Sequence, residues 1–319
     1  VFSPEISRQD ILGVSHMPQI ELEKSLKIDT SKFASRQWKN WTEPKIVEVE
    51  GLDVAYRREG QGETLVYLHG GAGTRQWGPI HQALAEQFDV IAPEHPGYGD
   101  TPRFEDQDSW TDFVLHYDAF FRKLNLTHFH LVGTSLGAWL AANLAVYFPE
   151  RYASITLITP LGLHIDDEPF IDVFRFQPED ALDALFNGRA AAHEELLVQE
   201  GGTSDILQAF HEDGTSALLF WNPRYDYKLN RRLQRVKAPA LVIAAEDDRM
   251  TGNLQPARYA ALLPNSELKT LGNVSNSPTS HALVYENPQE VAALISAFIA
   301  KNRTSAPALS TAVKTAAEA

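Results

Sequence analysis

The chain has 319 residues, 44% hydrophobic and 22% charged, and its 42 acidic against 28 basic residues give a formal net charge of −14. This composition is that of a globular protein with enough apolar material for one large domain. Excess acid repels phosphate backbones and anionic lipid, so we expect neither a nucleic-acid nor a membrane partner. With no cysteine, the chain has no disulfide, thiolate nucleophile or cysteine metal site.

The sequence also bears on the compartment of the protein. No apolar run approaches the ~20 residues that are needed to span a bilayer. The first residues, VFSPEISRQD, show no basic segment followed by an apolar stretch. We therefore expect a cytoplasmic protein, with export after removal of a leader as the alternative, because the chain begins with Val.

Residues 1–44 are polar and irregular. We predict an N-terminal extension that packs on the main domain through Trp38 and Trp41. An alternation of apolar and polar residues then predicts a β-hairpin formed by residues 46–49 and 52–57.

From residue 64 onward, short apolar runs alternate with segments of helical spacing. Such alternation predicts an α/β fold, in which a mostly parallel, eight-stranded sheet carries helices on both faces. The predicted domains are a core formed by residues 45–160 and 237–302, a helical insertion without strands at 161–236, and a disordered Ala/Ser/Thr-rich tail at 303–319. The further predicted strands are 64–68, 88–92, 129–132, 155–158, 240–245 and 267–271, and the predicted helices are 77–87, 110–124, 138–147, 255–263 and 288–301.

The motif G-x-S-x-G occurs as GTSLG at residues 133–137. A buried strand is predicted directly before it and an apolar helix directly after it, which is the strand-turn-helix setting of a nucleophile elbow. The tight turn would hold the Ser135 hydroxyl at the tip of the sheet, above the N-terminus of a helix that favours developing negative charge. Ser135 is the predicted nucleophile.

A serine hydroxyl needs a base to take its proton, and a histidine needs an acid to orient it. His281 is the one histidine in the loop between the last predicted strand and the last helix, where the base belongs in the order serine, acid, histidine. Glu246, Asp247 and Asp248 follow the preceding strand, and spacing alone does not separate them. We favour Asp248, the farthest into the loop, with Asp247 as runner-up.

A glycine-rich loop follows the central predicted strand, with the sequence HGGAG at residues 69–73. Such a loop brings backbone N–H groups close to a reacting carbonyl. The predicted oxyanion-hole donors are the N–H groups of Gly71 and Leu136. Neither G-x-G-x-x-G, G-K-[ST] nor H-E-x-x-H is present, so we expect no nucleotide, metal or other cofactor.

Together these motifs resemble the α/β-hydrolase superfamily, in the lid-bearing branch that includes esterases, C–C bond hydrolases and proline iminopeptidases. The resemblance covers residues 46–301 and is carried, in chain order, by HGGAG, PGYGDT, GTSLGA, LVIAAEDDR and HALVYENP. It implies a serine hydrolase. It also supports Asp248, because the second aspartate of a G-x-D-D-like loop is the acid in that family.

The chain departs from the family pattern in places that leave the catalytic groups intact. Ala245 and Ser280 stand where glycine is usual, and Asp100 stands where serine is frequent. The epoxide hydrolases and dehalogenases of the family use an aspartate nucleophile, and Ser135 argues against both.

The resemblance makes residues 161–236 a helical lid over the active site. The density of aromatic residues there predicts an apolar underside that encloses a hydrophobic acyl or alcohol group, although these rings could instead form the core of the lid itself. The candidate substrate-binding residues are Trp77, Trp139, Phe174 and Trp221.

The leading interpretation is a carboxylic ester hydrolase that acts on a small-molecule substrate through an acyl-enzyme. A C–C bond hydrolase of the ring-cleavage type would use the same triad, but its relatives usually show HGGGPG and an asparagine before the serine, whereas this chain has HGGAG and Thr134. A non-catalytic ligand binder on the same fold is the third reading. The sequence leaves the oligomeric state and the natural substrate open.

Overall fold

The computed structural model describes residues 37–38, 42–71, 73–166, 172–176, 178–198, 203–221, 223–272 and 278–303. All of them lie in the second of two compact units, residues 35–319. Most of the predicted extension and nearly all of the predicted tail lie outside the described residues, as do Trp41 and the side chain of Trp38.

Eight strands form one sheet in the order β10-β9-β7-β6-β4-β5-β3-β2. The pairs β2–β3 and β3–β5 are antiparallel and all the others are parallel, as the βαβ alternation in the sequence predicts. The fold is therefore that of an α/β hydrolase. The strands are β2 (Lys45–Val49), β3 (Leu52–Glu59), β4 (Thr64–Leu68), β5 (Asp89–Pro93), β6 (Phe129–Thr134), β7 (Tyr152–Ile158), β9 (Ala240–Ala245) and β10 (Ser266–Leu271).

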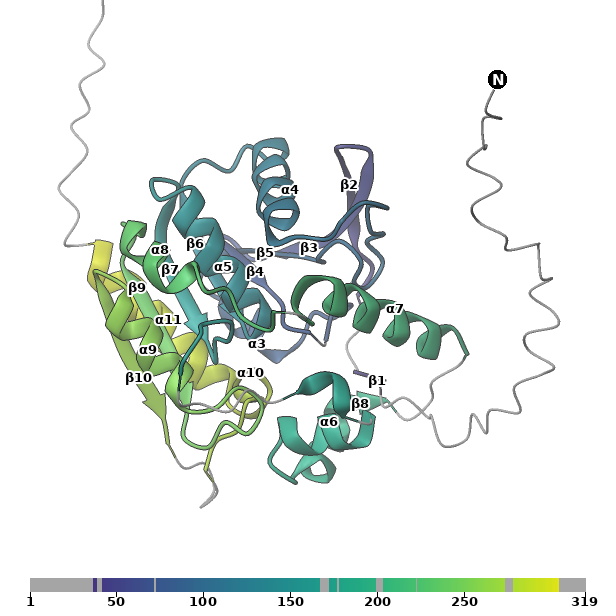
Figure 1. The fold of residues 1–319 in the computed structure, drawn as a ribbon. Helices are drawn as coiled ribbons and strands as arrows, with labels where there is room; N and C mark the ends of the chain where they lie inside the picture. Colours follow the sequence, from purple (N-terminus) through teal and green to yellow (C-terminus); the bar gives the residue numbers. More distant parts are fainter. Residues whose placement is uncertain are drawn as a thin grey trace, which may run out of the picture. The chain divides into compact units, whose positions relative to one another are not determined.

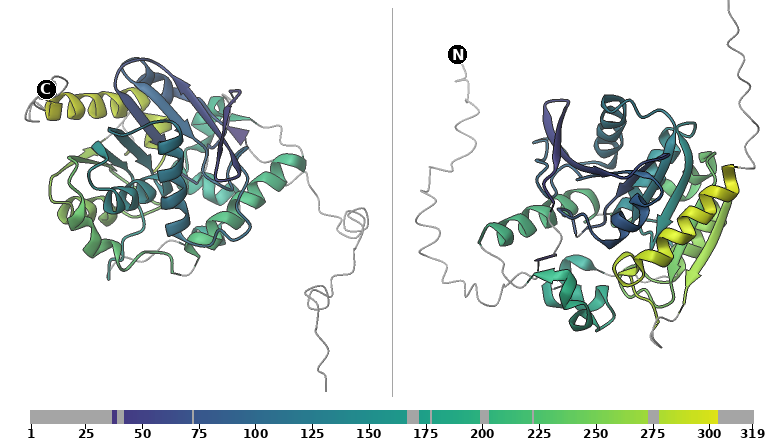
Figure 2. Two further views of the ribbon diagram at one scale, coloured as in Figure 1. Left: turned by 90° about the horizontal axis from the view of Figure 1, so that it is seen from above. Right: turned by 180° about the vertical axis from the view of Figure 1, so that it is seen from behind.

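Helices cover both faces of this sheet (Figure 1, Figure 2). One layer contains α4 (Trp110–Lys123), α5 (Leu136–Tyr147), α8 (Leu229–Arg232) and α9 (Leu254–Leu262); the other contains α3 (Pro79–Ala85), α10 (Leu283–Glu286) and α11 (Pro288–Arg303).

The apolar run of β4 shows why the sheet is buried on both sides. Val66 and Leu68 belong to the core under the first layer of helices, and Leu65 and Tyr67 belong to the core under the second. Because successive side chains of a strand point to opposite faces, a continuous apolar run fills both cores.

The segment between β7 and β9 interrupts the alternation, as predicted for residues 161–236. Its helical elements are η2 (Val173–Arg175), α6 (Pro178–Leu185), η3 (Ala190–Leu196), α7 (Thr203–Phe220), α8 and η4 (Leu233–Arg235). The segment also contains a strand that was not expected, β8 (Leu197–Val198), which pairs antiparallel with β1 (Gln37–Trp38). Two residues are too short for an alternation to be visible in the sequence.

No helix in the part of the chain that the structure describes is both long enough and apolar enough to cross a membrane.

Candidate active site

Ser135 occupies the single residue between β6 and α5. Its backbone has φ 53° and ψ −116°, a region that a residue with a side chain rarely adopts. The Ser135 N–H donates to the carbonyl of Ile158 at 2.9 Å, and its own carbonyl accepts from the N–H groups of Ala138 and Trp139 at 3.0 and 3.1 Å. These bonds hold the strained turn, which leaves the Ser135 side chain half-buried between buried neighbours.

The two glycines of the elbow are required by close backbone contacts. A Cβ on Gly133 would lie 2.2 Å from the carbonyl oxygen of Gly137, and a Cβ on Gly137 would lie 2.2 Å from that of Leu68. A side chain at Gly133 would keep the strand before the serine away from the helix after it, and a side chain at Gly137 would keep that helix away from the end of β4. The glycines of the motif therefore shape the turn, and the serine projects from it.

Asp248 and His281 form a buried hydrogen-bonded pair. Asp248 lies in the loop after β9 and His281 in the loop after β10, and His281 Nδ1 is 2.8 Å from Asp248 Oδ2. Since β6, β9 and β10 run parallel in one sheet, the loops that carry Ser135, Asp248 and His281 open at the same edge. Nδ1 is engaged by the carboxylate, so Nε2 is the ring nitrogen that can accept a proton.

The carboxylate of Asp248 is held from several directions. Its Oδ1 accepts the N–H groups of Met250 and Thr251, both at 2.9 Å, and its Oδ2 accepts the Thr251 hydroxyl at 2.9 Å. Burial raises the pKa of Asp248, but the charge and hydrogen bond of His281 and the bonds from Thr251 outweigh it, and the pKa lies below its usual value. Asp248 is thus ionised at neutral pH.

The other two acids of this loop point elsewhere. Asp247 Oδ2 accepts from Arg249 Nε at 3.0 Å and from Asn187 Nδ2 at 3.3 Å, and Glu246 is exposed. Of the three adjacent carboxylates that spacing could not separate, the structure brings Asp248 to His281.

Thr251 and Thr279 support the pair and were not identified from the sequence. The Thr279 hydroxyl donates to the carbonyl of Leu271 at 2.6 Å and accepts the N–H of Glu246 at 2.9 Å, while its carbonyl accepts the N–H of Asp247 at 3.0 Å. These bonds fasten the acid-bearing loop to the histidine-bearing loop. A threonine among loop residues gives no signal in the sequence, because its role depends on a partner 33 residues away.

The glycine-rich loop after β4 lies against the nucleophile. A Cβ on Gly70 would lie 3.3 Å from Ser135 Cβ. Gly71, a predicted oxyanion donor, follows in this loop and is exposed, with open space where a side chain would be. Leu136, the other predicted donor, is the first residue of α5, where helix geometry leaves N–H groups without an intrahelical acceptor. Gly71 therefore follows a residue that lies against Ser135, and Leu136 directly follows Ser135 in the chain.

A chain of buried rings supports the start of this loop. The His95 N–H donates to His69 Nε2 at 3.0 Å, so the His69 proton sits on Nδ1, which donates to the carbonyl of Gly70 at 2.6 Å. His95 Nε2 in turn lies 2.9 Å from the carbonyl of His69, and its Nδ1 lies 2.5 Å from the hydroxyl of Tyr117. Burial lowers the pKa of His69 to about 4, and the ring is neutral at physiological pH.

The four candidate substrate-binding residues lie in different surroundings. Trp77 and Trp139 are 4% and 1% exposed; Trp77 stacks on His81, and Trp139 lies 4.2 Å, ring centre to ring centre, from Trp110. Burial leaves these two rings little surface to offer to a ligand. Phe174 and Trp221 stack on each other at 5.9 Å, and Trp221 is 59% exposed.

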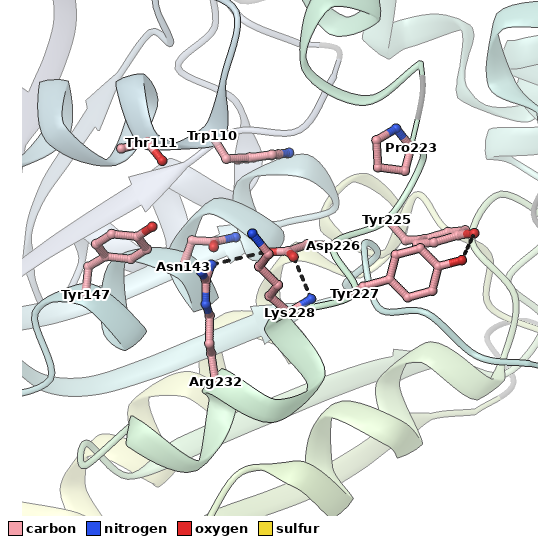
Figure 3. A pocket seen from close by; sticks show the side chains of 10 residues that line it. All are labelled: Trp110, Thr111, Asn143, Tyr147, Pro223, Tyr225, Asp226, Tyr227, Lys228 and Arg232. Carbon is pink, nitrogen blue, oxygen red and sulfur yellow. Dashed lines mark hydrogen bonds and ion pairs between the residues drawn. The ribbon is translucent and has the colours of Figure 1, made fainter.

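A pocket of about 330 Å³ lies between the N-terminus of α4, the C-terminal half of α5 and residues 223–232 (Figure 3). Asn143 and Tyr147, which line it, are eight and twelve residues beyond Ser135 on α5, or about 12 and 18 Å along the helix axis. The pocket is therefore separate from the edge of the sheet that carries the predicted triad. Its lining residues, none of them predicted as site residues, are Trp110, Thr111, Asn143, Tyr147, Pro223, Tyr225, Asp226, Tyr227, Lys228 and Arg232.

No group of three or more His, Asp or Glu side chains within the described ranges is arranged to hold a metal ion. The polar groups at the edge of the sheet include a serine, an aspartate and a histidine, in the chain order that serine hydrolases of this fold use.

Comparison with known proteins gives the family. Residues 65–294 match the alpha/beta hydrolase family. The chain belongs to this family. It is 26% identical to the monoacylglycerol lipase ABHD6 of Mus musculus over 76% of the chain and 77% of that protein. It is 29% identical to a 2-hydroxy-6-oxononadienedioate/2-hydroxy-6-oxononatrienedioate hydrolase of Burkholderia vietnamiensis over 69% of the chain and 83% of that protein.

Solved structures of similar fold carry different names. A putative lipase of Acinetobacter baumannii superposes with a TM-score of 0.68 at 20% identity, covering 92% of this chain and all of that one. A meta-cleavage product hydrolase of Pseudomonas fluorescens gives 0.67 at 21% identity, covering 81% and 97%. At this level of identity these likenesses establish the fold of this hydrolase.

Proposed function

We propose that the protein is a serine hydrolase that cleaves a carboxylic ester with a hydrophobic acyl or alcohol group through an acyl-enzyme. The observation that carries the proposal is the buried Asp248–His281 pair, at the edge of the sheet where the elbow presents Ser135. The names of the relatives, a monoacylglycerol lipase and a 2-hydroxy-6-oxononadienedioate/2-hydroxy-6-oxononatrienedioate hydrolase among them, support hydrolysis of a carbonyl compound.

In the first half of the proposed reaction, His281 Nε2 takes the hydroxyl proton of Ser135 as Oγ attacks the ester carbonyl. The N–H groups of Gly71 and Leu136 stabilise the oxyanion that forms, and Asp248 stabilises the imidazolium through Nδ1. The imidazolium then protonates the leaving alkoxide, the C–O bond breaks, and the acyl group remains on Ser135. In the second half, His281 deprotonates a water that attacks the acyl carbonyl; the bond from that carbon to Ser135 Oγ then breaks, His281 returns the proton to Oγ, and the carboxylic acid leaves.

We further propose that residues 161–236 form a lid that encloses the hydrophobic part of the substrate. Within this segment, the ring of Phe174 packs at 5.2 Å from Phe220, and Phe220 lies 6.0 Å from Trp139, four residues beyond the nucleophile. This aromatic cluster connects the insertion to the start of α5. It supports an apolar wall on that side of the site.

The test is hydrolysis of a short-chain p-nitrophenyl ester by the wild type and by Ser135→Ala. The matched control is Ser154→Ala, because Ser154 Oγ lies 2.8 Å from His130 Nδ1 but stands on a strand rather than in an elbow. We expect activity to be lost only in Ser135→Ala. An undiminished rate in that variant would contradict the proposal.

A C–C bond hydrolase is the second candidate, because the Burkholderia relative at 29% identity is named as a 2-hydroxy-6-oxononadienedioate/2-hydroxy-6-oxononatrienedioate hydrolase. Such an enzyme would use the same three side chains on a vinylogous diketone. If the protein cleaves a ring-cleavage diketone much faster than any simple ester in a panel, this candidate replaces the ester hydrolase.

A further inference from the structure

One carboxylate oxygen joins three separate segments of the chain beside the predicted oxyanion loop. Glu212 Oε1, on α7, accepts the Thr74 hydroxyl at 3.1 Å, the Gly99 N–H at 2.8 Å and Gln208 Nε2 at 3.0 Å. Thr74 lies three residues after Gly71, and Gly99 lies in the loop after β5. Hydrogen bonds to an ionised acceptor are stronger than those between neutral groups, so this oxygen is an effective anchor.

The face of α7 that carries Glu212 is polar where it meets these loops. The Thr215 hydroxyl donates to the carbonyl of Gly97 at 3.3 Å, and the Ser216 hydroxyl lies 2.6 Å from the side-chain hydroxyl of Tyr98. A Cβ on Gly97 would lie 2.5 Å from Thr215 Oγ1, so the helix and the loop are in close contact. Three and four residues separate these positions from Glu212, which puts them on one side of the helix.

The opposite face of α7 is apolar and exposed. Its exposed fractions are 63% at Leu207, 77% at Phe210 and 48% at Leu218. A surface helix ordinarily buries its apolar stripe and exposes its polar one. Here the arrangement is reversed between Leu207 and Ser216, and hydrogen bonds rather than apolar burial hold this part of α7 to the two loops.

The loop after β5 is itself firmly held. Glu94 is 1% exposed, forms a buried ion pair with Arg57 at 2.5 Å, and accepts the Asp100 N–H. Arg75, next to Thr74, pairs with Asp100 at 2.8 Å and donates to the carbonyl of Gly99 at 3.1 Å. The far end of the oxyanion loop is therefore fastened to the loop after β5 and, through Glu212, to α7.

We propose that Glu212 is a positioning residue that sets the oxyanion loop, so that the hole is complete only while α7 is docked. The proposal rests on the proposed function. Gly71 has open space around it and Gly73 packs closely on Tyr285, and the hydrogen-bonded and ion-paired points of the loop are His69 at one end and Thr74 with Arg75 at the other. When the second point is loosened, the Gly71 N–H is no longer held in the direction that the oxyanion needs.

Loss of this anchor should weaken binding of the transition state more than binding of the substrate. Oxyanion contacts strengthen as the tetrahedral intermediate forms, so their loss lowers kcat more than it raises KM. The step itself is unchanged: Ser135 attacks the carbonyl carbon, and the electron pair of the C=O bond moves to the oxygen that Gly71 and Leu136 face. Glu212 acts on this step through the loop and does not touch the substrate.

The test compares Glu212→Ala, Glu212→Gln and Thr74→Val in p-nitrophenyl ester hydrolysis and in the rate of fluorophosphonate labelling. For Glu212→Ala we expect kcat to fall about tenfold while KM changes by less than about twofold. Glu212→Gln, which keeps an oxygen acceptor, should recover most of the loss. The kcat of Thr74→Val should also be lower than that of the wild type. The kcat of the double variant should be no lower than that of Glu212→Ala alone, because both changes remove the same anchor.

The matched control is Asp213→Asn, which removes the neighbouring carboxylate of the same helix and should leave kcat unchanged. A wild-type kcat in Glu212→Ala, a change confined to KM, or an equal loss in Asp213→Asn would overturn the inference. If Glu212→Ala does not fold, Thr74→Val tests the same bond from the loop side. The proposed function fails separately, when the wild type itself neither hydrolyses the ester nor takes the label.

Discussion

Replacement of Asp248 by asparagine isolates the electrostatic role of the acid, because the amide has nearly the same shape. Its carbonyl oxygen can still accept the N–H groups of Met250 and Thr251 that now bond to Oδ1. The amide nitrogen then faces His281 Nδ1, which is 2.8 Å from the present Oδ2. A donor there forces the imidazole proton onto Nε2, and His281 can no longer accept the proton of Ser135.

The size of the effect follows from what remains. The oxyanion hole and substrate binding survive, but the base is in the wrong tautomer, so kcat should fall roughly 10³- to 10⁴-fold, or about 4–5.5 kcal/mol in activation free energy. Folding should change little, by on the order of 1 kcal/mol, since most hydrogen bonds of the side chain are kept. Steady-state hydrolysis of a p-nitrophenyl ester gives kcat, and urea denaturation gives the free energy of unfolding.

Asp247→Asn is the control, because this neighbour bonds to Arg249 and Asn187 instead of to His281. We expect the kcat of Asp247→Asn to stay within about threefold of the wild-type value, because this substitution lies outside the hydrogen bonds of His281. This role of Asp248 would be contradicted if folded Asp248→Asn kept more than about a tenth of the wild-type kcat, or if the kcat of Asp247→Asn fell as far as that of Asp248→Asn.

Two further predictions concern the folded state. Gly137→Ala places a Cβ 2.2 Å from the carbonyl oxygen of Leu68, so the elbow must open. Urea denaturation should show that the free energy of unfolding falls by about 1–3 kcal/mol, and activity should be lost. In the control Gly71→Ala, the added Cβ meets nothing within 4 Å, and the variant should unfold as the wild type does. Burial also lowers the pKa of five histidines below 6.5, three of them to about 3 or 4, and since the folded state favours their neutral forms, the unfolded chain takes up protons first as pH falls. The contribution of each histidine to the free energy of unfolding should be complete above about pH 6.5 and should decrease toward pH 4 by about 1.4 kcal/mol per pH unit. Equal urea midpoints at pH 7 and pH 5 would contradict this. These pKa values are about 4 for His69 and His116 and about 3 for His81.

The sheet was predictable because its strands are encoded locally. A run such as residues 64–68 buries both faces of a strand and is visible as five consecutive residues with little polar interruption. The position of Ser135 in an elbow was predictable for a similar reason, since the strand, the turn glycines and the helix that create the elbow are contiguous in the chain.

Features that depend on partners far apart in the sequence were not predictable. The choice among Glu246, Asp247 and Asp248 depends on how one loop folds against another 33 residues away. The hydrogen bonds that Glu212 accepts from Thr74 and Gly99 join residues 138 and 113 positions apart, and no local spacing in the sequence indicates them. The pairing of β1 with β8 involves two residues on each side, too few to form a pattern.

The central claim is that Ser135 is the nucleophile. A fluorophosphonate probe followed by intact-mass measurement and peptide mapping tests it most directly, because the probe phosphonylates a serine only when a base and an oxyanion hole activate it. The account predicts a single adduct on Ser135 in the folded wild type and no adduct in Ser135→Ala. A folded wild type that takes no label, or a label that persists in Ser135→Ala, would contradict it.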